Sequence, residues 1–174
     1  MKRHPGLREL SVEHHHALVH AHRLIAAAES SPHEMSDAAG RFLEFWDAAA
    51  SAHFREEEEI LLPVCARFGY DLMSEQITQM LSDHAHIRGM VMDLRDQQAK
   101  GGLSADGLRR LGSRLDAHVR LEERVIFPDM QIRLPDAALM LVGQMLSVYA
   151  EVCEMASPEE EGAGEKVLDS SGTG

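Results

Sequence analysis

The sequence is poor in cysteine and in positive charge. Its 174 residues include two cysteines, Cys65 and Cys153, which leave room for at most one bridge. This excludes a disulfide framework and a cysteine-rich zinc site, and it fits a reducing compartment. Lysine and arginine number 17 against 29 aspartates and glutamates, so the formal net charge is −12. That balance argues against nucleic acid or an anionic membrane as a partner.

Long apolar runs and strand signals are also missing. No stretch approaches the roughly 18 apolar residues that a membrane span needs. The N-terminal Met-Lys-Arg-His-Pro-Gly leads into a polar, histidine-rich pattern with no apolar signal region, so we expect a cytoplasmic protein. Aromatic residues make up 5% of the chain, and no alternating run is bounded by turns, so no strands are predicted.

What remains is a helical period. It predicts four long helices and a shorter fifth, at about residues 11–28 (with residue 7 as another start), 35–68, 74–100, 104–133 and 136–156. Short loops between long helices imply antiparallel neighbours. The prediction is therefore an all-α fold, an up-down antiparallel four-helix bundle with an extra C-terminal helix, formed by residues 1–156. The acidic, Gly/Ser-rich residues 157–174 are predicted to be a disordered tail.

One motif occurs twice in the predicted second and fourth helices. The pattern His-x3-Glu-x5-Pro is repeated 65 residues apart, as His53, Glu57 and Pro63 and as His118, Glu122 and Pro128. Histidine and glutamate four apart share one helix face. That face is otherwise apolar, with Leu115 and Val125 beside His118. Unpartnered imidazole and carboxylate groups are costly to bury, so a metal ion is the simplest compensation. The prolines should kink or locally break their helices.

The predicted first and third helices each add one histidine to this set. His84 lies on a helix face with Ile77, Met80, Leu81, Ile87 and Val91. In the triplet of residues 14–16 only one histidine can face inward. The apolar residues of that helix centre on His14, and aligning residues 13–16 with 83–86 agrees; His15 stays the alternative. The chain thus reads as two tandem helical hairpins that each supply two histidines and one glutamate.

Four histidines and two glutamates limit the choice of metal. Imidazole suits iron, zinc, copper and nickel, and six ligands are too many for one closed structural zinc site. The twofold arrangement favours two ions, each held by two histidines, with Glu57 and Glu122 able to bridge. Iron is the preferred metal, and positions left free would bind O2, peroxide or NO.

These motifs resemble those of the hemerythrin-like (HHE cation-binding) domains. The resemblance is carried by Glu13-His14, residues 53–63, Asp83-His84 and residues 118–128. It implies a four-helix bundle with a non-haem, oxo- or hydroxo-bridged diiron centre. The metal ligands it implies are His14, His53, Glu57, His84, His118 and Glu122.

The sequence departs from the oxygen-carrying hemerythrins at two places. They carry a further histidine on the third helix, where this chain has Arg88, and His-x4-Asp on the fourth, where it has His-x3-Glu. The ligand set looks closer to bacterial and regulatory HHE proteins, whose roles include oxygen or iron sensing, peroxide handling and the nitrosative-stress response.

Three functions stay open at this point. The chain could bind or sense O2, iron or redox state, act as a diiron oxidoreductase that removes peroxide or nitric oxide, or hold iron or zinc without redox chemistry. A sensor would need a separate protein partner, since no DNA-binding, kinase or methyl-accepting segment is attached. The other histidines, notably His16, His20, His22 and His86, are expected to face solvent or lie outside the ligand set. Some of Glu56, Glu58, Glu59 and Glu123 could hydrogen-bond the ligand histidines.

Overall fold

The computed structural model describes residues 2–156 of the chain, and their side chains up to residue 152. Regular structure in these residues is entirely helical, which confirms the all-α prediction. The elements are η1 (Pro5–Leu7), α1 (Arg8–Ala27), α2 (Pro32–Phe45), η2 (Trp46–Ala50), α3 (Ser51–Glu56), η3 (Glu57–Leu61), α4 (Leu62–Arg67), α5 (Glu75–Lys100), α6 (Ala105–Leu121), η4 (Glu122–Ile126), α7 (Phe127–Arg133) and α8 (Asp136–Ala156). The predicted tail, residues 157–174, lies outside the described residues.

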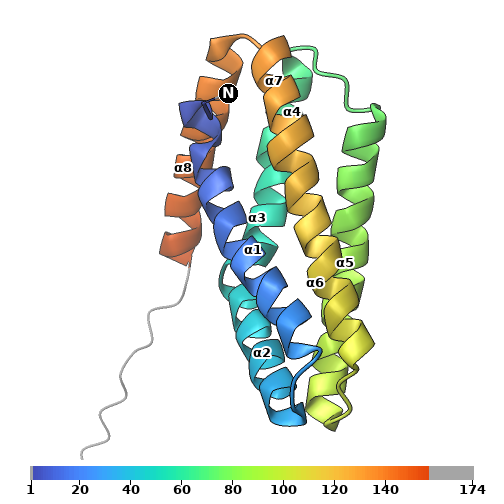
Figure 1. Ribbon diagram of the computed structural model, residues 1–174. Helices are drawn as coiled ribbons and strands as arrows, with labels where there is room; N and C mark the ends of the chain where they lie inside the picture. The colour runs from blue at the N-terminus through green and yellow to red at the C-terminus, as the bar shows by residue number, and fades with distance from the viewer. Residues whose placement is uncertain (1, 157–174) are drawn as a thin grey trace, which may run out of the picture.

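Four long rods form the bundle, and each runs antiparallel to the one before it in the chain, as Figure 1 shows. They are α1, the continuous run from α2 to α4, α5, and the run from α6 to α7. Serine side chains cap the N-termini of α2, α5 and α6 at Ser31, Ser74 and Ser104. Ser31 forms a capping box with Glu34 and is followed by Pro32, which is favourable at a first helical position. The second rod therefore starts at residue 32 and not near residue 35 as predicted.

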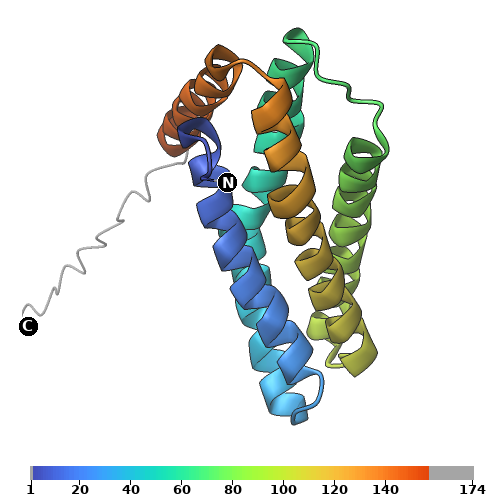
Figure 2. The same cartoon turned by 45° about the horizontal axis from the view of Figure 1, so that its top comes forward.

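The added helix α8 packs on one side of the bundle. Figure 2 shows it against the start of α1 and away from α5. Its buried Ala138, Val142 and Leu146 complete an apolar cluster with residues of both hairpins. Gly6 and Gly143 allow this close approach, because a Cβ on Gly143 would lie 2.8 Å from the Gly6 Cα. The fifth helix is thus an integral part of the core.

Each repeated proline follows a π-helical turn. Pro63 lies in the first turn of α4 directly after η3, and Pro128 lies in the first turn of α7 directly after η4. A proline inside a helix lacks an N–H and clashes with the carbonyl four residues earlier. The wider i→i+5 turn accommodates both defects. The predicted local break is therefore a π turn, and the helix continues beyond it.

The π turns also change which side chains face inward. A π turn contains one more residue than an α-helical turn. Each side chain after it therefore points where the side chain one position earlier would point in a regular α-helix. Ile126 is therefore buried (1% exposed), whereas Val125 is 43% exposed, and the prediction that Val125 shares the buried face with His118 is wrong. Leu81 is 40% exposed as well. It lies at the edge of the α5 face that Ile77, Met80, Ile87 and Val91 fill, so its predicted place beside His84 is also wrong.

Candidate metal centre

A buried polar layer separates two apolar clusters in the bundle. One cluster includes Leu10 and Met80, and the other includes Ala17 and Ile87. The polar layer consists of the six residues predicted as ligands, His14, His53, Glu57, His84, His118 and Glu122, and each is at most 6% exposed. His15 is exposed on α1, so the structure brings His14, and not its neighbour, to the centre.

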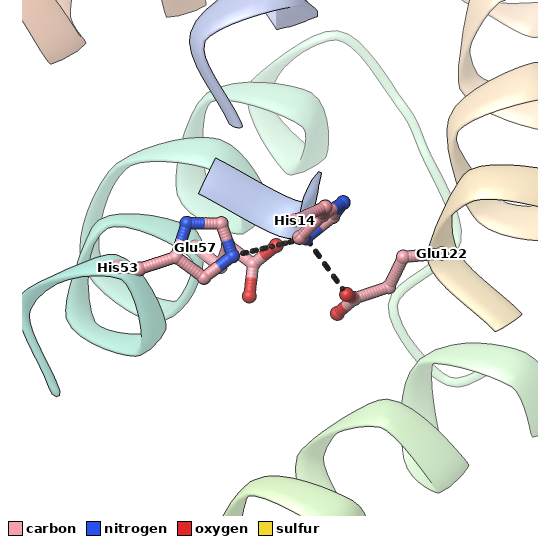
Figure 3. Close-up of side chains that lie close together, drawn as sticks. All are labelled: His14, His53, Glu57 and Glu122. Carbon is pink, nitrogen blue, oxygen red and sulfur yellow. Dashed lines mark ion pairs between the residues drawn. The ribbon is translucent and has the colours of Figure 1, made fainter. Parts of the chain in front are cut away.

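The imidazole Nε2 atoms surround the two carboxylates. Figure 3 shows His14 between Glu57 and Glu122, 3.6 Å and 3.1 Å from their oxygens. The Nε2 of His53 lies 3.4 Å from Glu57, and that of His118 lies 3.3 Å from Glu122. His84 reaches both glutamates, at 3.2 Å and 3.8 Å. The six side chains therefore converge from all four rods.

These atoms form two overlapping groups with the geometry of metal sites. One comprises His14, His53, Glu57 and Glu122, and the other comprises Glu57, His84, His118 and Glu122; within each group the donor atoms lie within 4.8 Å of one another. Both glutamates belong to both groups. None of the four Nε2 atoms or the four carboxylate oxygens has a hydrogen-bond partner among the described residues. These buried atoms contact one another only as ion pairs of 3.1–3.8 Å. Buried polar atoms without hydrogen bonds are costly, so the residues fit a bound cation pair.

A second layer of carboxylates holds the outer faces of three histidines. Glu123 accepts from Nδ1 of His14 at 2.8 Å, Glu13 from His53 at 2.6 Å and Glu58 from His84 at 2.6 Å. Such bonds fix the ring tautomer and leave Nε2 free for a metal. The Nδ1 atom of His118, by contrast, is buried with no hydrogen-bond partner in the described part of the chain.

Cations on the surface anchor two of these outer carboxylates. Arg88 donates two hydrogen bonds to Glu58, at 2.8 Å and 3.0 Å, and Arg3 donates to Glu123. Glu58 and Glu123 were among the candidates from the sequence, but Glu13 was missed. The sequence shows only that Glu13 and Asp83 occupy matching positions in the two hairpins. It does not show that Glu13 bonds His53, which lies on another helix.

The carboxylates determine the protonation of the metal-free centre. Burial lowers the pKa of each histidine, but neighbouring carboxylates outweigh it at three of them. They raise the pKa of His14 well above its usual value, that of His53 to about 9 and that of His84 to about 10. At His118 burial dominates and the pKa falls. Although burial opposes it, the nearby His53 holds the pKa of Glu57 well below its usual range.

The other histidines lie apart from the two groups. His22 pairs with Asp116 at 3.0 Å on the surface, and His86 is exposed. His20 stacks on Phe45 with ring centroids 4.2 Å apart. His16 and His20 line a cavity of about 180 Å³ whose inner wall includes His14, His53 and His118. This cavity lies between α1, η2 and α6 and reaches three of the four buried histidines.

No described helix has the length and apolar character to cross a membrane. No curated protein and no solved structure matches the chain. The family model described as the hemerythrin HHE cation binding domain matches residues 6–138. This range covers α1 to α7 and all six buried polar residues, and it confirms the resemblance predicted from the motifs. The chain belongs to the hemerythrin HHE cation-binding family, whose members bind metal ions, typically iron, within a helical bundle.

Proposed function

We propose that His14, His53, Glu57, His84, His118 and Glu122 hold two iron ions, and that the centre binds O2 or a related small ligand. The observation that carries this proposal is the set of eight buried nitrogen and oxygen atoms without hydrogen-bond partners. A protein core tolerates such a set only when something else compensates it.

The donor set supports a pair of ions in place of one. Each of the two groups contributes two histidines, and both include Glu57 and Glu122, so the glutamates are suited to bridge. Two carboxylates would neutralise part of the metal charge and lower the cost of burying it. A mixture of imidazole and carboxylate without thiolate suits iron, and facing helices of a bundle commonly build such sites.

The surrounding residues would prepare this centre for a small ligand. Glu13, Glu58 and Glu123 hold Nδ1 protons, so that three Nε2 atoms stay available. The apolar clusters on both sides exclude bulk water. When bound, a reduced iron pair supplies electrons to a small oxidant. The cavity beside His53 gives such a molecule a path from the surface.

The test is metal analysis of protein purified without added metal, followed by optical spectra. We expect about two irons per chain and the near-ultraviolet charge-transfer bands of a ferric pair. The reduced protein should then give a reversible spectral change with O2. One zinc per chain, or no metal, would overturn the diiron proposal and leave a storage or structural role.

The same sample separates a binding protein from an enzyme. Steady consumption of added peroxide or NO in the presence of excess chemical reductant, lost in Glu57→Ala, would replace the binding function with that of an oxidoreductase. A reversible O2 adduct without turnover supports binding or sensing. Glu59→Ala is the matched control, since Glu59 lies two residues away and is exposed.

A further inference from the structure

The two hairpins are related by position but differ where they open to solvent. The cavity between α1 and η2 is lined by His16, His20, Phe45 and Ala49 on its outer part. The corresponding positions of the second hairpin, 70 or 65 residues later, are His86, Met90, Arg110 and Arg114, and they line a surface groove. The cavity has three of the six centre residues in its wall, whereas the groove has none.

One pair of side chains accounts for this difference. Arg114 stands where the first hairpin has Ala49, and its guanidinium donates to Asp83, which also accepts from Gln79 at 3.0 Å. The Asp83 side chain is 8% exposed, so the pair fills the space between the groove and the centre. On the other side Ala49 offers only a methyl group, and Glu13 turns to His53. The first entrance is therefore open and the second is closed.

The open cavity has the character of a binding pocket for an uncharged molecule. Its walls are mainly apolar and come from Ala17, Ala49, Ala50, Phe54, Leu115 and Val119. Its volume of about 180 Å³ is far more than a diatomic molecule fills. Preformed apolar cavities of roughly 150 Å³ take up benzene or xenon. Glu13 at its wall is already paired with His53, and an ion would lose its hydration among the apolar side chains.

We propose that this cavity binds a neutral, apolar molecule up to the size of one aromatic ring, next to His53 and His118, and that the Arg114–Asp83 pair blocks the matching approach from the second hairpin. The proposal rests on the proposed function only in placing that molecule beside a metal pair. Occupation of the cavity itself requires no metal.

The test uses the metal-free full chain, with benzene and xenon as probes in calorimetry and xenon nuclear magnetic resonance. We expect saturable binding of one molecule per cavity. Ala49→Phe should weaken it at least tenfold by filling the cavity, while Ser113→Phe, in the groove of the second hairpin, should leave it unchanged. Circular dichroism checks that both variants are folded.

Absence of benzene and xenon binding in the wild type, or equal binding in folded Ala49→Phe, would overturn the proposal. In iron-loaded, reduced protein, benzene should slow the association of NO, a neutral ligand, because both would pass through the cavity. Unchanged NO kinetics at saturating benzene would overturn the placement beside the metal. Metal analysis is an independent measurement. A chain that holds iron but binds no benzene contradicts only this inference, and a chain that binds benzene but holds no iron contradicts only the proposed function.

Discussion

The first hairpin, α1 with the run from α2 to α4, and the second, α5 with the run from α6 to α7, present the same side chains to the centre. They surround these side chains differently. In the first, Glu13 accepts a hydrogen bond from the outer nitrogen of His53. In the second, Asp83 occupies the matching position but pairs with Arg114, and the outer nitrogen of His118 has no hydrogen-bond partner among the described residues. The inner atoms are thus repeated, and so are the bonds from Glu123 to His14 and from Glu58 to His84. Only the bond between Glu13 and His53 has no counterpart in the second hairpin.

The difference shows how a small change in the second layer can make two similar metal positions unequal. Aspartate is one methylene shorter than glutamate, and a guanidinium one turn before His118 attracts it. A carboxylate bonded to a ligand histidine orients the ring and raises its basicity. We therefore expect the ion beside His53 to be held more tightly than the ion beside His118.

The largest effects should follow from removing one ligand in each hairpin. His53→Ala and His118→Ala should each lower the iron content from about two to about one per chain or less, because each ion relies on two histidines. Loss of bound metal should also lower Tm by at least about 5 °C, since metal binding contributes to folding free energy. Metal analysis and calorimetry measure both. Unchanged iron content in either variant would show that the ring is not a ligand.

A pair of neighbouring residues tests the π turn of the second hairpin. Ile126→Ala should reduce the free energy of unfolding by about 2–5 kcal/mol, because the side chain is buried. Val125→Ala should change it by less than about 0.5 kcal/mol. In the first hairpin the matching Leu61 and Ile60 are both buried, since α8 packs on η3, so both alanine variants should be costly there. Denaturant unfolding measures these free energies. Equal losses in Val125→Ala and Ile126→Ala would mean that the π turn does not turn residue 126 inward and residue 125 outward.

The outer carboxylates provide the next comparison. Glu13→Gln should weaken metal binding by about 10–100-fold, the usual effect of losing such a partner. Asp83→Asn should leave metal affinity near that of the wild type, because Asp83 bonds Arg114 and not His118. Competition with a chelator of known affinity measures both. Equal losses in the two variants would mean that Asp83 does support His118 when metal is bound.

The smallest expected effects concern protons. At pH 7 the raised pKa values of His14, His53 and His84 keep these rings charged in the metal-free protein, whereas the lowered pKa leaves His118 neutral. Metal loading at pH 7 should therefore release protons from three histidines and none from the fourth. The dependence of binding enthalpy on buffer ionisation counts them. If replacing His14, His53 or His84 leaves the number of released protons unchanged, this assignment is wrong.

The same shifts predict how the metal-free protein responds to alkali. A folded pKa above the unfolded value of 6.5 contributes stability that is complete below pH 6.5 and is lost as pH rises through the folded value. For His53 and His84 this loss should extend through about pH 9 and about pH 10. Tm of the metal-free protein should therefore fall between pH 7 and pH 10. A constant Tm over this range would contradict the raised values.

Much of the fold could be read from the sequence because helical periodicity is a local property. The spacing of His53 and Glu57, and of His118 and Glu122, predicts buried polar pairs on apolar faces, and the structure buries all four. The start of the second helix is less accurate, because the Ser31 cap places it at Pro32 and not near residue 35. The faces were wrong at Val125 and Leu81, because a π turn and the edge of a packing surface are not visible in an ideal helical repeat.

The sequence by itself determined the all-α bundle, the family and the six side chains that gather at the centre, because their spacing decides which helix face each one occupies. The tertiary structure decided the rest, since it depends on contacts between helices. It paired Glu13 with His53 and Asp83 with Arg114. It also covered η3 with α8 and placed a cavity beside His14, His53 and His118. These outcomes depend on side-chain length and on distances across the bundle, which the order of residues along one helix does not specify.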